Sequence, residues 1–198
     1  MFNLKSKVLS AAVSLPVVAA GLLSAAGSAE ALNGRFSFDG DRTTATISNA
    51  GFNFTDPNRI ELGLTTGDFV GDLGGSISDT LFASLPPIFI NIDGDGKELT
   101  VSSFANPVFT TISGGVDISF NFVGVFEDGS NAIGNIDFTT FDFTNVGAAQ
   151  IAYNGGSSIN SVFKGVVVAS VPEPTTMLGL GLVAAGMTVA RRRKLVKA

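Results

Sequence analysis

Apolar and polar residues alternate with a period of two through much of residues 32–170, and this alternation constrains the fold more than any other feature. Over residues 116–122, four apolar residues face one way and three polar residues face the other. The same alternation recurs at 36–38, 60–64 and 136–138. A period of two sends successive side chains to opposite faces of a strand, so these segments are predicted to be half-buried antiparallel strands.

Glycine-containing pairs such as Asp128-Gly129 and Gly114-Gly115 separate the predicted strands. Such pairs tolerate a positive φ and mark hairpin turns. Further strands are predicted over 42–48, 88–92, 98–104, 108–113 and 159–168. The pattern indicates an all-β domain built as an antiparallel β-sandwich, with a jelly roll or a barrel as the alternative.

Helical periodicity is weak in the same region. No window of about a dozen residues between 32 and 170 has a helical period free of glycine and proline, and only 79–85 is predicted to hold a short helical turn. After Thr139 and Thr140 the apolar positions shift by one, to Phe141 and Phe143. A bulge or tight bend is predicted there, because either would restore the apolar face.

The N-terminus has the composition of a secretory signal peptide. Residues 1–7 are basic, residues 8–26 are uncharged and apolar, and Ala29-Glu30-Ala31 gives the small-x-small pattern that signal peptidase recognises. Residues 1–31 are therefore predicted to be a signal peptide that is cut after Ala31. A retained signal anchor is the alternative, which Pro16 and Gly21 disfavour.

The C-terminus combines a rigid polar motif, a short apolar span and a basic end. It consists of Val171-Pro172-Glu173-Pro174, an uncharged stretch over 175–190 and the cations Arg191, Arg192, Arg193 and Lys194. The prolines fix φ and favour an extended, accessible spacer. A short hydrophobic helix over 175–190 would be about 24 Å long, less than the roughly 30 Å of a bilayer core. The cations should hold its end on the cytoplasmic side as a membrane stop.

This order of features resembles the PEP-CTERM sorting signal of Gram-negative bacteria. The resemblance implies that a membrane-bound exosortase recognises Pro172, Glu173 and Pro174 and cleaves near them, after the span has held the precursor transiently in the inner membrane. The implied destination is the outer envelope or the extracellular space. The resemblance covers 171–198 and leaves the domain over 32–170 unassigned. A permanent membrane anchor is the alternative interpretation of the same tail.

Charge and composition exclude several functions for the predicted domain. Between Leu32 and Pro174 there are five cations and sixteen acids, a formal charge near −11. Such a charge argues against nucleic acid and anionic membranes as partners. The chain has neither cysteine nor histidine. Nucleophilic catalysis of the Ser-His or Cys-His type is therefore excluded, and zinc, copper and haem sites lose their usual ligands.

One loop offers metal ligands. Asp93 and Asp95 resemble the first two ligands of a calcium loop, but Lys97 stands where the third oxygen ligand belongs and Glu98 where the glycine belongs. We interpret this loop as a hairpin turn, with a calcium site on Asp93 and Asp95 as the alternative. No other cofactor is expected.

Enzymatic activity is not expected. Glu61, Glu98 and Glu127 could supply a carboxylate pair for glycoside hydrolysis, but no sugar-stacking aromatic residues bracket them. The chain has no tryptophan and a single tyrosine, Tyr153. The sequence therefore predicts an exported envelope or extracellular-matrix protein with a structural or interaction role. The alternative is a surface module that binds calcium or carbohydrate, with extracellular polysaccharide as its partner.

Overall fold

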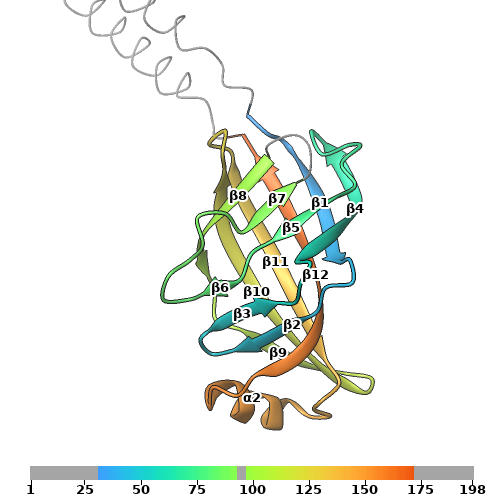
Figure 1. Cartoon of the computed structure of the whole chain (residues 1–198), viewed down its shortest axis with the longest axis vertical. Coiled ribbons are helices and arrows are strands. Elements are labelled where there is room, and N and C mark those ends of the chain that lie inside the picture. Colours follow the sequence, from blue (N-terminus) through green and yellow to red (C-terminus); the bar gives the residue numbers. More distant parts are fainter. Residues whose placement is uncertain (1–30, 93–96, 172–198) are drawn as a thin grey trace, which may run out of the picture. The chain divides into compact units, whose positions relative to one another are not determined.

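The computed structural model of the protein describes residues 31–92 and 97–171. These residues form an eight-stranded antiparallel barrel with additional strands and a short helix (Figure 1). The barrel strands follow one another in the order β1 (Gly34–Gly40), β4 (Arg59–Gly67), β5 (Gly74–Ile77), β7 (Ile90–Ile92), β8 (Lys97–Phe104), β10 (Gly115–Phe126), β11 (Asn131–Thr140) and β12 (Ile159–Ser170). Pairing of β12 with β1 closes the barrel. The all-β prediction is confirmed, and the arrangement is the barrel alternative.

Three long neighbouring strands, β10, β11 and β12, form one wall along the length of the barrel (Figure 1). On each side, two shorter strands share the free edge of this wall. The first part of β10 pairs with β9 (Val108–Ile112) and its last part with β8. The first part of β12 pairs with β2 (Ala45–Ser48) and the rest with β1. β3 (Gly51–Phe54) and β6 (Thr80–Leu81) continue outward from β2.

Phenylalanine fills the core. The fully buried rings belong to Phe36, Phe38, Phe69, Phe89, Phe120, Phe126 and Phe138. Phe52 from β3 lies at the centre of the largest cluster, with ring centroids 4.7 Å from Phe138 and 4.9 Å from Phe120. Edge-on and tilted ring pairs of this kind add roughly 0.5–1.5 kcal/mol each beyond the burial of their area. The alternating phenylalanines of the sequence thus converge on one interior.

Two strand glycines make room for these rings. Gly165 on β12 pairs with Phe38 on β1, and a Cβ atom there would clash with the Phe38 ring and with the carbonyl of Asn135. Gly134 on β11 lies opposite Phe122 in the same way. The wall can therefore hold the Phe38 and Phe122 rings because these two positions carry no side chain.

The structure corrects several local predictions. A helix, α2 (Val146–Asn154), lies where none was predicted, with the Asn145 side chain accepting a hydrogen bond from the N–H of Ala148 as its N-cap. Residues 79–85 contain β6 rather than a helical turn. The chain bends after Thr140, as predicted, but Phe141 is 65% exposed and does not return to the apolar face.

No helix within 31–92 and 97–171 has the length and apolar character needed to cross a membrane. The hydrophobic helix predicted over 175–190 and the signal peptide up to Glu30 lie outside the described residues.

Substitution of two glycines by alanine should change stability in opposite directions. Gly165→Ala should lower the free energy of unfolding by about 1–3 kcal/mol, because the added methyl group overpacks the site beside Phe38. Gly147→Ala in the first turn of α2 should raise it by up to about 1 kcal/mol, because the nearest atom to the new methyl is 3.5 Å away and alanine favours helix. Urea denaturation followed by circular dichroism measures both. Equal effects of the two substitutions would contradict the packing described here.

Candidate functional site

Most site residues predicted from the sequence lie outside the described residues. These are Ala29 at the signal cleavage site, the candidate calcium ligands Asp93 and Asp95, the motif residues Pro172, Glu173 and Pro174, and the membrane-stop residues Arg191, Arg192, Arg193 and Lys194. Ala31 lies at the beginning of the described domain, partly exposed. Within residues 31–92 and 97–171, no group of three or more acidic side chains is placed to hold a metal ion.

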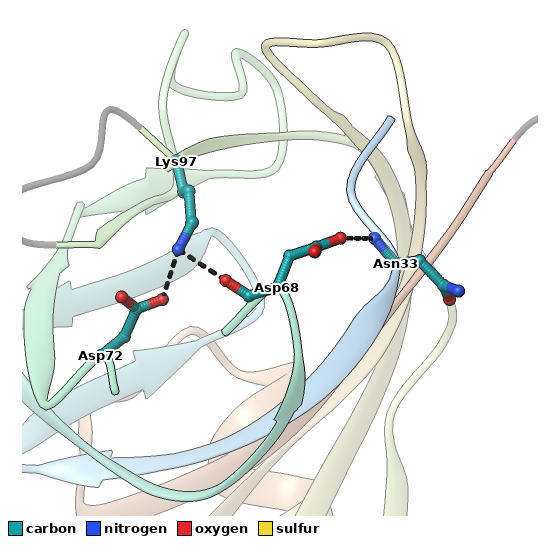
Figure 2. A network of polar contacts seen from close by, with 4 residues as sticks. All are labelled: Asn33, Asp68, Asp72 and Lys97. Carbon is teal, nitrogen blue, oxygen red and sulfur yellow. Dashed lines mark hydrogen bonds and ion pairs between the residues drawn. The ribbon is translucent and has the colours of Figure 1, made fainter. Parts of the chain in front are cut away.

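Lys97, which follows the candidate calcium loop, is held in a network of polar contacts (Figure 2). Its ammonium group donates to the carboxylate of Asp72 at 2.8 Å and to the carbonyl of Asp68 at 2.7 Å. It also lies 5.6 Å from the centroid of the Phe69 ring. Since the side chains of Lys97 and Asp72 are only 12% and 8% exposed, this network anchors the loop between β4 and β5 on the start of β8.

The three glutamates considered for glycoside hydrolysis do not share one site. Glu98 on β8 accepts a hydrogen bond from the Asn91 amide at 3.1 Å, and the N–H of Glu127 donates to the Glu98 carbonyl at 3.0 Å. Glu61 lies on β4, which β5 and β7 separate from β8. It borders a hollow of about 790 Å³ that no aromatic side chain lines. The backbones of Glu98 and Glu127 are thus adjacent, and Glu61 lies apart from both.

A cavity of about 660 Å³, which we name the α2 cavity, lies beside α2. The helix α2 is at the lower end of the barrel in Figure 1. The cavity lies where β8 gives way to β9 along the edge of β10, between this junction and α2. Its lining comprises Asn49, Phe82, Leu85, Ser102, Ser103, Phe104, Ala105, Asn106, Pro107, Phe109, Phe120, Gln150, Tyr153 and Asn154. The sequence analysis did not predict this site. The single tyrosine, Tyr153, and the neighbouring amides Gln150 and Asn154 are the sequence features that could have indicated it.

The α2 cavity combines aromatic walls with neutral polar groups. Four lining side chains are amides and two are serine hydroxyls, and no acidic or basic side chain is among them. The amide of Asn49 donates to the Asn154 carbonyl at 3.0 Å and so joins the turn after β2 to the end of α2. The side chains of Asn106 and Gln150 are exposed and have no hydrogen-bond partner in the part of the chain that the structure describes. They are available to a ligand.

Tyr153 is the most buried polar residue of the α2 cavity. Its side chain is 6% exposed, and its ring packs against Phe109 at 5.6 Å and Phe120 at 6.3 Å between centroids. Its hydroxyl has no hydrogen-bond partner among residues 31–92 and 97–171. Burial raises the pKa of Tyr153 above its ordinary value of about 10.

The opposite end of the barrel holds both ends of the domain. Gly34 at the start of β1 pairs with Ala169 near the end of β12. The backbone N–H of Leu32 donates to the carboxylate of Asp128, which also accepts from the N–H and the hydroxyl of Ser130 at 2.8 Å and 2.7 Å. Partial burial raises the pKa of Asp128, but these hydrogen bonds outweigh it, so the pKa lies below its ordinary value of 3.8.

Comparison with protein families identifies the tail. The family model for the PEP-CTERM protein-sorting motif matches residues 170–194. The match confirms the resemblance found in the sequence, and it implies processing by an exosortase and export to the cell envelope. No curated protein matches the chain, and no solved structure does.

Titration of the single tyrosine should report the α2 cavity directly. Because burial disfavours the phenolate, Tyr153 of the folded protein should ionise at a higher pH than the same residue in urea, where its pKa should be about 10. Tyr153 should therefore stabilise the fold less as the pH rises above about 10, since the unfolded chain loses this proton first. Phenolate absorbance measures both states, and coincident titration curves would contradict the burial described.

Proposed function

We propose that the protein is exported through its signal peptide, sorted by its PEP-CTERM tail, and has a structural or interaction role in the outer envelope or extracellular matrix. The observation that carries this proposal is the position of the sorting motif. Its match begins at residue 170, where β12 ends, so the last barrel strand continues directly into the processing site. The tail is thus joined to a closed domain that needs none of the residues beyond 171 to complete its barrel.

The geometry of the barrel supports export followed by sorting at the membrane. Gly34 and Ala169 are paired, so the two ends of the domain, each next to a predicted processing site, lie at the same end of the barrel. The α2 cavity lies beside α2, and this helix is at the other end of the barrel (Figure 1). A precursor held in the inner membrane by one end of the barrel would present the α2 cavity away from the bilayer.

Removal of the signal peptide would strengthen a contact that already exists. Cleavage after Ala31 turns the backbone nitrogen of Leu32 into an α-ammonium group, and this nitrogen donates to Asp128. The hydrogen bonds that Asp128 accepts lower its pKa and favour its ionised form. The new α-ammonium group would therefore form a charge-assisted hydrogen bond with the Asp128 carboxylate. Processing would then fasten the start of β1 to the turn between β10 and β11.

We propose no catalytic role for the domain. The chain has no histidine or cysteine, Glu61 is separated from Glu98 and Glu127, and the contact between Glu98 and Glu127 is a hydrogen bond between their backbones. Carbohydrate binding is the second candidate function, and the specific observation that favours it is the α2 cavity.

Replacement of Pro172, Glu173 and Pro174 by alanine should block sorting. The altered chain should accumulate in the inner membrane with its tail, because an exosortase would no longer find its recognition site. Alanine at the flanking Val171 and Thr175 is the matched control and should leave sorting intact. Intact mass spectrometry of the mature envelope protein should show a chain that begins at Leu32 and lacks residues from about 175 onward. A mature surface protein that ends at Ala198 would leave only the permanent-anchor interpretation.

Asp128→Asn should destabilise the processed protein more than the precursor. The additional loss should be about 0.5–1 kcal/mol, the scale of a partly exposed ion pair. This additional loss of stability should depend on pH. It should decrease below the ordinary pKa of 3.8, where Asp128 becomes protonated, and again above about pH 8, where the α-ammonium group loses its proton. Urea denaturation of chains with and without residues 1–31 measures the difference, and an equal loss in both chains would contradict the proposed contact.

A further inference from the structure

We propose that the α2 cavity binds an uncharged saccharide. This inference deepens the proposed interaction role and rests on export of the domain only for its biological setting, since binding itself is a property of the barrel. Four observations carry it: the volume of the cavity, its aromatic walls, its neutral polar lining and the unpaired hydroxyl of Tyr153.

The cavity has the volume of a small-molecule site. Its 660 Å³ fall within the range of roughly 300–1,000 Å³ that such pockets span. The β8–β10 pairing shifts register at Ser102, which leaves this serine without a direct partner on β10. The short loop over 105–107 then carries the chain to β9 along the same edge. The hollow is therefore built by the strand exchange along β10 and by α2.

Aromatic rings supply one half of the recognition chemistry. Phe82, Phe104 and Phe109 are partly buried, so each has ring surface accessible to a ligand. Their positions are fixed from behind by the core, for Phe82 and Phe104 both contact Phe52 edge-on at 5.0 Å and 5.2 Å. The C–H face of a sugar ring is apolar and can pack on such surfaces without charge.

Neutral hydrogen-bonding groups supply the other half. Amide and hydroxyl side chains both donate and accept, and so do the hydroxyls of a sugar. Between Leu32 and Pro174 acids outnumber cations by sixteen to five, yet no charged side chain lines this cavity. A lining of this kind favours a polar, uncharged ligand and offers no counter-charge to an ion.

The Tyr153 hydroxyl points to a ligand group that the protein itself does not supply. Tyr153 as a whole is more than nine-tenths buried, but its hydroxyl is not among the buried unpaired atoms, so the oxygen keeps access to the cavity that the residue lines. Residues 31–92 and 97–171 offer this hydroxyl no partner, so it can exchange hydrogen bonds with a molecule in the cavity. A sugar hydroxyl in the cavity would satisfy it.

Two other occupants fit less well. A purely apolar ligand would cover the amides of Asn106 and Gln150 without offering them hydrogen bonds. One recurring way to recognise an extended peptide is a free strand edge with its row of backbone groups. Here the polar groups are side chains from separate elements, the turn after β2, the loop after β8 and α2.

The test uses the protein purified from the cells that produce it, in a detergent without a sugar headgroup if the tail is retained. Isothermal titration with neutral trisaccharides of glucose, galactose and mannose should give saturable binding to at least one, accompanied by a change in the emission of Tyr153, the only tyrosine. A trisaccharide of a uronic acid should bind at least tenfold more weakly.

Variants then locate the binding. Gln150→Ala and Asn106→Ala should each weaken it about tenfold or more, and both side chains are exposed, so the fold should be unaffected. Tyr153→Phe keeps the ring and should weaken binding similarly. The matched control is Asn131→Ala, an exposed amide at the other end of the barrel, which should bind as the unaltered protein does.

Three results would overturn the inference: no saturable binding of any neutral trisaccharide, equal weakening by Asn131→Ala, or saturable binding of a neutral tripeptide in place of the sugars. None of them bears on sorting, which the intact mass of the mature protein decides separately. Conversely, a retained tail would contradict the sorting proposal and leave the binding result valid.

Discussion

The antiparallel pairing of β12 with β1 is the contact on which the rest of the structure depends. It runs from Gly34 opposite Ala169 to Asp39 opposite Lys164 and turns a curved sheet into a closed barrel. Closure removes the two free edges that an open sheet would present to other chains. It also forces Phe38 against β12, where only glycine at position 165 leaves room for the ring. The closing contact and the phenylalanine core therefore require each other.

Closure also gives the barrel two ends that differ in their strand pairing and contacts. At one end, β1 begins beside the end of β12, and contacts to Asp128 and the Lys97 network secure the neighbouring loops. At the other end, β9 and β2 replace β8 and β1 as partners of the long strands. Along β10, the register of β8 shifts at Ser102, and the loop over 105–107 separates β8 from β9. The α2 cavity lies at one of these exchanges, which explains why a tightly filled barrel has a hollow there.

Most strands could be predicted from the sequence, because a period of two is a local signal that residues such as those over 116–122 express in full. The sorting tail could be recognised for the same reason, since its parts are contiguous. Closure into a barrel could be named only as an alternative to a sandwich, because the pairing of β12 with β1 joins segments far apart in the chain. α2 was missed because it spans only nine residues and contains Gly147, although Asn145 and Gly155 mark its two ends. The α2 cavity was missed because its amides come from separate elements.

The charges of the domain are distributed unevenly between its surface and the α2 cavity. The many carboxylates of the domain lie away from the α2 cavity, where they keep an exported protein soluble and repel nucleic acid and anionic surfaces. A charged cavity in such a domain would select ligands through a field that varies with ionic strength, because salt screens charges beyond about 10 Å at 0.1 M. Packing on phenylalanine and hydrogen bonds from neutral amides are much less sensitive to salt. The separation of surface charge from a neutral cavity therefore suits the proposed binding of an uncharged ligand by an acidic domain.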